Sequence, residues 1–224
     1  EESSSNSNGS KMGGTDSSGS SNSEQGSGST GDSSASTEKY QIQNNAVLLR
    51  NTSDIDWNEL QNQAENLYKS WTTITLDLNT MNVTSDDILA YNTNLDNLMI
   101  SLKEKNKINS AICLANMYSL IPKYTNEISS DTAKSKLENV KSNIIFAYSI
   151  VETDRWDDVL KLLGQAETDL TELMAMKENL SAIRKPKINK AYVLLKELIK
   201  SSNDKNVDIF YLKYINLIEE LDNL

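Results

Sequence analysis

Four acidic residues cluster in the C-terminal half of the chain: Glu152, Asp154, Asp157 and Asp158. Carboxylates at this spacing could hold a cation or serve as a general acid and base. The alternative is that they lie at the start of a helix, where acids complement the helix dipole and stay in solvent. We favour the second interpretation because no Asp-x-Asp-x-Asp-Gly calcium loop accompanies them. The sequence therefore predicts no metal site.

The chain contains no histidine and one cysteine, Cys113. The lack of imidazole excludes Ser-His-Asp and Cys-His catalysis as well as His-ligated zinc. Cys113 lies in the apolar run Ala-Ile-Cys-Leu-Ala, where we expect a packed, inert thiol rather than a reactive one. An enzyme that uses carboxylates alone, such as a glycan hydrolase, stays open, but no pair of acids stands out. We predict no catalytic residue and no cofactor, and we expect a protein that is not an enzyme.

A basic stretch near residue 190 contrasts with the net charge of −10 of the whole chain. Its side chains could contact an anionic lipid or an acidic cell-wall polymer, or they could form the solvated face of an amphipathic helix. Three aromatic residues are expected to be exposed and could anchor a partner. The possible partner-binding residues are Arg184, Lys185, Lys187, Lys190, Tyr68, Tyr124 and Phe210. Nucleic acid is a poor partner for so acidic a chain.

Apolar residues recur at helical spacing from about residue 40 to the end of the chain. The pattern predicts helices at about 56–81, 85–102, 108–120, 129–151, 153–173, 186–199 and 207–221. Pro122 should kink or end the third helix, and Gly164 weakens the fifth by about 1 kcal/mol relative to alanine. Short connections favour antiparallel neighbours. We therefore predict one all-α domain over residues 39–224, an antiparallel up-and-down bundle of about six or seven helices. One bundle or two packed hairpin groups would both fit.

The first of these helices has the clearest pattern. Its apolar residues follow in alternating steps of three and four, which keeps one seam facing a partner helix. The seam consists of Trp57, Leu60, Ala64, Leu67, Trp71, Ile74, Leu78 and Met81. Before it, the run Ala-Val-Leu-Leu at 46–49 is too short to distinguish a strand from a helical turn. We expect that run to lie against the bundle.

Residues 1–38 have the composition of a spacer. The first 37 residues include fifteen serines and seven of the chain's eight glycines, with Met12 and Ala35 as the two apolar side chains. Such a segment cannot bury enough apolar surface to offset the entropy of ordering it, so we expect it to be disordered. At about 5–6 Å × √n, a linker of this length spans roughly 30–37 Å on average.

A Ser/Gly/Asn-rich spacer before a helical domain, in a chain that begins at Glu1 rather than methionine, resembles the mature region of a low-GC Gram-positive bacterial surface lipoprotein. The resemblance implies an extracellular, cell-surface location, with a lipid anchor on a cysteine ahead of Glu1. We expect a non-enzymatic, surface-tethered helical interaction module that binds a protein or a cell-wall component. The alternative is a solute- or ligand-binding accessory domain with a pocket between its helices. The sequence leaves the oligomeric state and the identity of the partner open.

Overall fold

The computed structural model describes residues 55–81, 83–176 and 184–224, and every regular element within these ranges is a helix. The helices are α2 (Trp57–Thr80), α3 (Ser85–Lys103), α4 (Lys107–Tyr118), α5 (Ile121–Ile128), α6 (Thr132–Ile150), the short 3-10 helix η2 (Val151–Thr153), α7 (Trp156–Ala175), α8 (Arg184–Asn203) and α9 (Val207–Asp222). The predicted all-α class is confirmed. The spacer and the run at 46–49 lie outside the described residues.

Local signals place the ends of these helices. The Asp56 carboxylate accepts hydrogen bonds from the backbone N–H groups of Asn58 and Glu59 at the start of α2. Asn106 and Asn206 cap α4 and α9 in the same way. These caps satisfy backbone donors that a helix leaves unpaired in its first turn.

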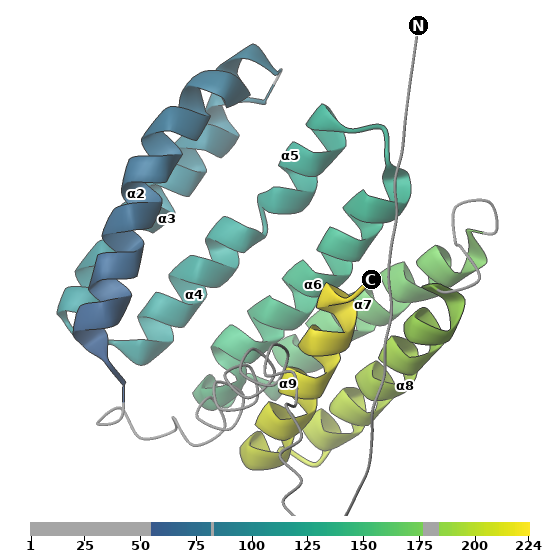
Figure 1. Cartoon of the computed structure of the whole chain (residues 1–224). Coiled ribbons are helices and arrows are strands. Elements are labelled where there is room, and N and C mark those ends of the chain that lie inside the picture. Colours follow the sequence, from purple (N-terminus) through teal and green to yellow (C-terminus); the bar gives the residue numbers. More distant parts are fainter. Residues whose placement is uncertain (1–54, 82, 177–183) are drawn as a thin grey trace, which may run out of the picture.

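Pro122 separates α4 from α5, as predicted. A proline inside a helix removes a backbone donor and clashes with the preceding turn, but its first turn tolerates one. Accordingly α4 ends at Tyr118, and Pro122 lies in the first turn of α5. The two helices follow one another as a single bent rod (Figure 1). With that rod counted once, the described residues form seven rods, which agrees with the predicted number.

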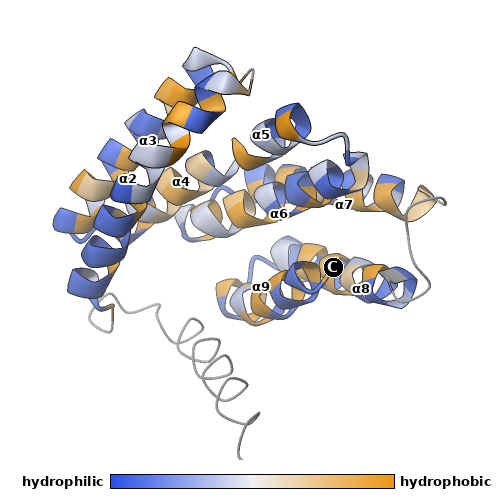
Figure 2. Cartoon of the chain, turned by 45° about the horizontal axis from the view of Figure 1, so that its top comes forward, coloured by the Kyte–Doolittle hydropathy of each residue, from blue (hydrophilic) through white to orange (hydrophobic). Residues whose placement is uncertain are grey.

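Consecutive helices pack side by side along the chain, from α2 to α9, and α6 also contacts α9. The hairpin of α8 and α9 lies below the α6–α7 pair, and α2 with α3 forms the opposite end of the molecule (Figure 2). The predicted antiparallel arrangement follows from the short connections between these rods.

Three helical hairpins, α3–α4, α6–α7 and α8–α9, share the same spacing of buried residues before their turns. Each turns at a residue with positive φ, namely Lys105, Asp154 and Lys205, and these are 49 and 51 residues apart. Counting back from each of them, the positions 17, 14, 10, 7, 4 and 3 residues earlier are buried or packed against the core. They are Ile88, Tyr91, Leu95, Leu98, Ser101 and Leu102, then Leu137, Val140, Ile144, Ala147, Ile150 and Val151, then Ile188, Ala191, Leu195, Leu198, Ser201 and Ser202. These three hairpins therefore repeat one pattern of buried positions.

Buried apolar side chains of the described residues fall into two clusters. One comes from α2 to α5 together with Val83, and the other comes from α6 to α9 and η2. Helix α4 joins them, because it packs on α3 through one side and on α6 through another, with Ile112 against the second cluster. This arrangement favours two packed hairpin groups over one continuous bundle.

Gly164 lies within α7 without interrupting it. A Cβ built at this position meets no atom within 4 Å, and the site is exposed. Because glycine loses more conformational freedom in a helix than alanine does, we expect Gly164→Ala to raise the free energy of unfolding by about 0.5–1 kcal/mol. Urea denaturation followed by circular dichroism measures the change. The control is Gln165→Gly at the exposed neighbouring position, which should lower the stability by a similar amount. A loss of stability in Gly164→Ala would contradict the expectation.

Candidate functional site

An apolar groove opens where the two clusters meet. Its volume is about 440 Å³. Residues of α2, α3, α4, α6 and α9 line it. Its lining is almost wholly apolar and includes Leu60, Leu67, Leu102, Ala111, Leu114, Ile145, Tyr148 and Tyr214. A concave apolar site of this size falls within the range of pockets that bind ligands.

The groove exists because the α2 seam is covered on one side only. Trp57, Ala64, Trp71 and Leu78, spaced seven residues apart, are buried in the cluster of α2 to α5. The alternating seam residues Leu60, Ile74 and Met81 remain exposed, and Leu67 is half-buried. Within the described residues α2 packs against α3. Leu60 and Leu67 of the second row line the groove, whereas Ile74 and Met81 do not.

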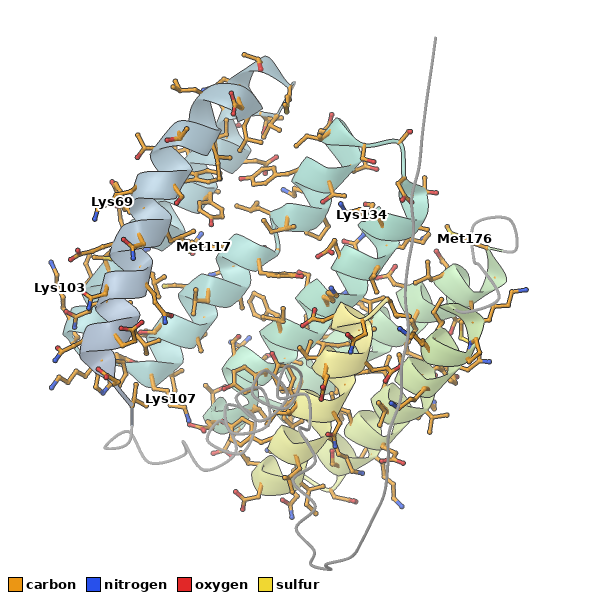
Figure 3. The ribbon with its side chains drawn as sticks, viewed as in Figure 1. Lys69, Lys103, Lys107, Met117, Lys134 and Met176 are labelled. Atoms are coloured by element: carbon orange, nitrogen blue, oxygen red, sulfur yellow. The ribbon has the colours of Figure 1, made fainter. Side chains whose placement is uncertain are left out.

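Ionic and aromatic side chains close one end of the groove. Lys107, in the first turn of α4 (Figure 3), places its Nζ 2.6 Å from a carboxylate oxygen of Glu152. The Tyr211 hydroxyl donates a hydrogen bond to the same carboxylate, and the Lys107 ammonium lies 5.6 Å from the centroid of the Tyr211 ring. The rings of Tyr148 and Tyr214 stack with centroids 4.4 Å apart. This junction fixes α4, α6 and α9 relative to one another.

Burial keeps the phenols at this end neutral. The pKa of Tyr148 is raised, mainly by desolvation and also by the nearby negative charge of Glu152. Desolvation likewise raises the pKa of Tyr214. A neutral phenol is compatible with an apolar ligand beside it. None of the described residues that line the groove is an aspartate or a glutamate, so these residues offer apolar contact rather than a pair of carboxylates.

Two of the predicted partner anchors are not on the surface. The expectation that Tyr124 and Phe210 are exposed is wrong, because they are only 6% and 0% exposed. The centroids of the Tyr124 and Trp71 rings are 6.2 Å apart. The Tyr124 hydroxyl donates a hydrogen bond to the backbone carbonyl of Asp87 at 3.0 Å. Phe210 belongs to the core of the cluster formed by α6 to α9. Tyr68 is exposed, as expected.

The basic residues of α8 do not form a surface with Tyr68, because α2 and α8 lie on opposite sides of the molecule (Figure 1). Lys190 pairs with Glu220 at 2.5 Å, and Lys187 donates to the carbonyl of Asn223 at 3.1 Å. Lys185 is exposed, and the side chain of Arg184 lies outside the described residues. Glu220 of α9 thus pairs with the charge of Lys190, while Lys187 binds a neutral carbonyl group.

The acidic cluster divides into two parts. Asp157 and Asp158 lie in the first turn of α7, as predicted, and Asp158 pairs with Arg155 at 2.7 Å. Glu152 instead belongs to the junction with Lys107. Across the described ranges, no group of three or more potential ligands is placed to hold a metal ion.

Cys113 is buried, and desolvation raises the pKa of its thiol. A raised pKa leaves less of the nucleophilic thiolate at neutral pH. The predicted burial of Cys113 is confirmed, and the low reactivity of its thiol stays a prediction.

Sequence reasoning missed the residues that matter most to the groove. Leu60 and Leu67 were recognised only as seam positions, while Leu114 carries no motif at all. One usable signal was present. The α2 seam consists of two rows of apolar residues, each with a seven-residue period, and each row needs its own packing surface. Which row stays open depends on packing between distant segments.

Comparisons with known proteins add no assignment. No family model matches this chain, and neither a curated protein nor a solved structure matches it. Among the described helices, none is long and apolar enough to cross a membrane.

Proposed function

We propose that this chain is a non-enzymatic helical interaction module, and that its groove binds an apolar peptide segment of a partner protein. The observation that carries the proposal is the apolar groove of about 440 Å³, which Leu60 and Leu67 of the uncovered α2 row line. Grooves between helices commonly receive an apolar face of a partner segment through anchors that repeat with the helical period. Leu60 and Leu67 supply such a repeat on α2.

The chemistry of the lining favours a protein over a cell-wall polymer. Polysaccharides present many hydroxyl groups, and a buried hydroxyl without a hydrogen-bond partner is costly. Few of the groove residues have polar side-chain atoms. They are Trp57, Gln63, Lys107, Ser110, Tyr148 and Tyr214. An aliphatic peptide side chain meets the lining without leaving polar groups unpaired.

The test compares partner retention by three full-length variants. Leu60→Asp and Leu114→Asp each place a charge in the groove, whereas Leu76→Asp changes a residue of α2 that is 70% exposed and does not line it. We expect a protein from the cell envelope to be retained by wild type and by Leu76→Asp, and lost from both groove variants. Equal retention by all three would overturn the proposal. Circular dichroism confirms that the variants remain helical.

The same proposal places the module at a cell surface, with residues 1–38 as its tether. The Ser/Gly-rich composition of that stretch supports the tether. Tethering raises the local concentration of a domain near surface partners without any new contact. Intact mass spectrometry of the native N-terminal peptide from the membrane fraction tests the location. A diacylglyceryl-cysteine ahead of Glu1 supports it, and a different upstream sequence without lipid would contradict it.

A second candidate function is binding of an apolar solute, and the size of the groove favours it. The volume of about 440 Å³ suits a small ligand as well as a few peptide side chains. A specific ligand raises the melting temperature as its concentration rises. Thermal unfolding in the presence of dodecanoate, with Leu114→Asp as control, tests this function. A flat response in wild type would remove it for fatty acids.

A further inference from the structure

We propose that, in the absence of a partner, residues 46–49 of the same chain (Ala-Val-Leu-Leu) occupy the groove. The inference rests on the proposed function, because it names the segment with which a partner would compete for the same site. The module would then be self-covered, and binding would require displacement of its own segment.

The first argument is position. Ile55, the first described residue, itself lines the groove at the start of α2. Leu49 is six residues before Ile55 in the sequence. At about 3.3–3.6 Å per residue, six residues reach at most roughly 20 Å. The apolar run is therefore confined to the neighbourhood of the groove by the length of chain that connects it.

The second argument is chemical match. Within residues 1–54, the run at 46–49 is the only place where four apolar residues follow one another. Apolar surface removed from water contributes about 25 cal/mol per Å², on both the segment and the groove. Leu60 on α2 and Leu114 on α4 both line the groove and are 37% and 47% exposed, so they have surface left to bury. No charged side chain of the run needs to be desolvated.

The third argument is effective concentration. A segment joined to its site by a short linker experiences a local concentration on the order of millimolar. Even weak apolar contacts are then sufficient to keep the groove covered most of the time. A partner segment must compete against that concentration, which would suppress binding of weak, non-specific apolar peptides.

A disulfide-trapping experiment tests the occupancy across the groove. Full-length Leu48→Cys/Leu114→Cys, in a Cys113→Ala background, is oxidised with oxidised glutathione at low protein concentration. The control pair is Leu48→Cys/Asn62→Cys, because Asn62 is exposed near the start of α2 and does not line the groove. We expect the intrachain bond to form at least about tenfold faster in the groove pair than in the control, since occupancy raises the local concentration of the two thiols.

Equal rates in the two pairs would overturn the proposal, because proximity through the linker alone would then explain the bond. Interchain bonds would also overturn it and would indicate that a second copy of the chain supplies the segment. Non-reducing electrophoresis and peptide mass spectrometry separate these outcomes.

A second measurement avoids engineered cysteines. In full-length Leu48→Asp, the segment should leave the groove, and fluorescence of the apolar dye ANS should rise severalfold over wild type. Ser20→Asp, which adds the same charge within the spacer, should leave the fluorescence unchanged. Unchanged fluorescence in Leu48→Asp, with helicity intact, would overturn the proposal. If the cysteine pair reacts quickly but no partner binding depends on the groove, the proposed function fails and this inference stands. If partner binding depends on the groove but Leu48→Asp does not strengthen that binding, the proposed function stands and this inference fails.

Discussion

Above about pH 10 the domain is expected to lose stability steeply and to unfold as its buried tyrosines ionise. Five tyrosines have a raised pKa, and for each of them desolvation by burial is the largest cause. They are Tyr91, Tyr118, Tyr124, Tyr148 and Tyr214. Tyr118 has a further cause, because its hydroxyl donates to the Glu138 carboxylate at 2.7 Å, and that bond is lost when the phenol ionises.

The direction of the effect follows from the pKa difference between the two states. In the unfolded chain a tyrosine ionises near pH 10, whereas in the folded domain these phenols stay neutral to higher pH. The stability that each contributes is therefore fully present below pH 10 and is lost as the pH rises through the folded pKa. Each group lowers the free energy of unfolding by at most about 1.4 kcal/mol per pH unit. Five groups together reach roughly 7 kcal/mol per unit, which is comparable with the whole stability of a domain.

Parallel titrations of phenolate absorbance and helical circular dichroism measure this effect. We expect a cooperative transition in which both signals change together. Tyr148→Phe removes one of the five ionisable groups and should move the midpoint to higher pH. Tyr68→Phe is the matched control, because Tyr68 is 47% exposed and should leave the midpoint in place. Smooth ionisation near pH 10 with the helices intact would show that the five phenols are accessible to solvent.

The helices could be predicted from the sequence because their signals are local. The spacing of apolar residues from Trp57 to Met81 defines α2, and Asp56 and Pro122 act within one turn of the helix ends that they set. Lys-Asn recurs at 105–106 and at 205–206, where two of the hairpins turn. That repeat was visible in the sequence, but its significance depends on a shared register of buried residues.

The groove and the buried anchors could not be predicted in the same way, because they depend on contacts between distant segments. Tyr124 lies on a helix of eight residues, where the sequence pattern does not decide which side faces the core. Its burial results from packing near Trp71, which is 53 residues away along the chain. Likewise, the α2 seam shows which residues are apolar but not that a single neighbour, α3, covers only one row of them.

Replacing Trp71 by alanine is expected to cost about 3–5 kcal/mol of stability, the usual range for deleting a buried tryptophan. Trp71 is 6% exposed, and its ring stacks on that of Tyr91 with centroids 3.8 Å apart. Its indole N–H donates to the Asn92 side chain, so the substitution also removes the partner of a half-buried oxygen. Urea denaturation measures the loss. Tyr68→Ala, three residues earlier on the exposed side of α2, should change the stability by about 0.5 kcal/mol or less.

The position of Trp71 also predicts where the molecule opens first. Trp71 belongs to the cluster of α2 to α5, and the cluster of α6 to α9 has a separate set of buried residues, including Leu163 and Leu195. Because helical-hairpin arrays are stabilised by contacts between neighbours, damage in one group should weaken that group before the other. We expect amide hydrogen exchange in Trp71→Ala to accelerate strongly in α2 and α3 and only weakly in α7 and α8. Equal acceleration in all four helices would mean that α4 couples the two clusters into one cooperative unit.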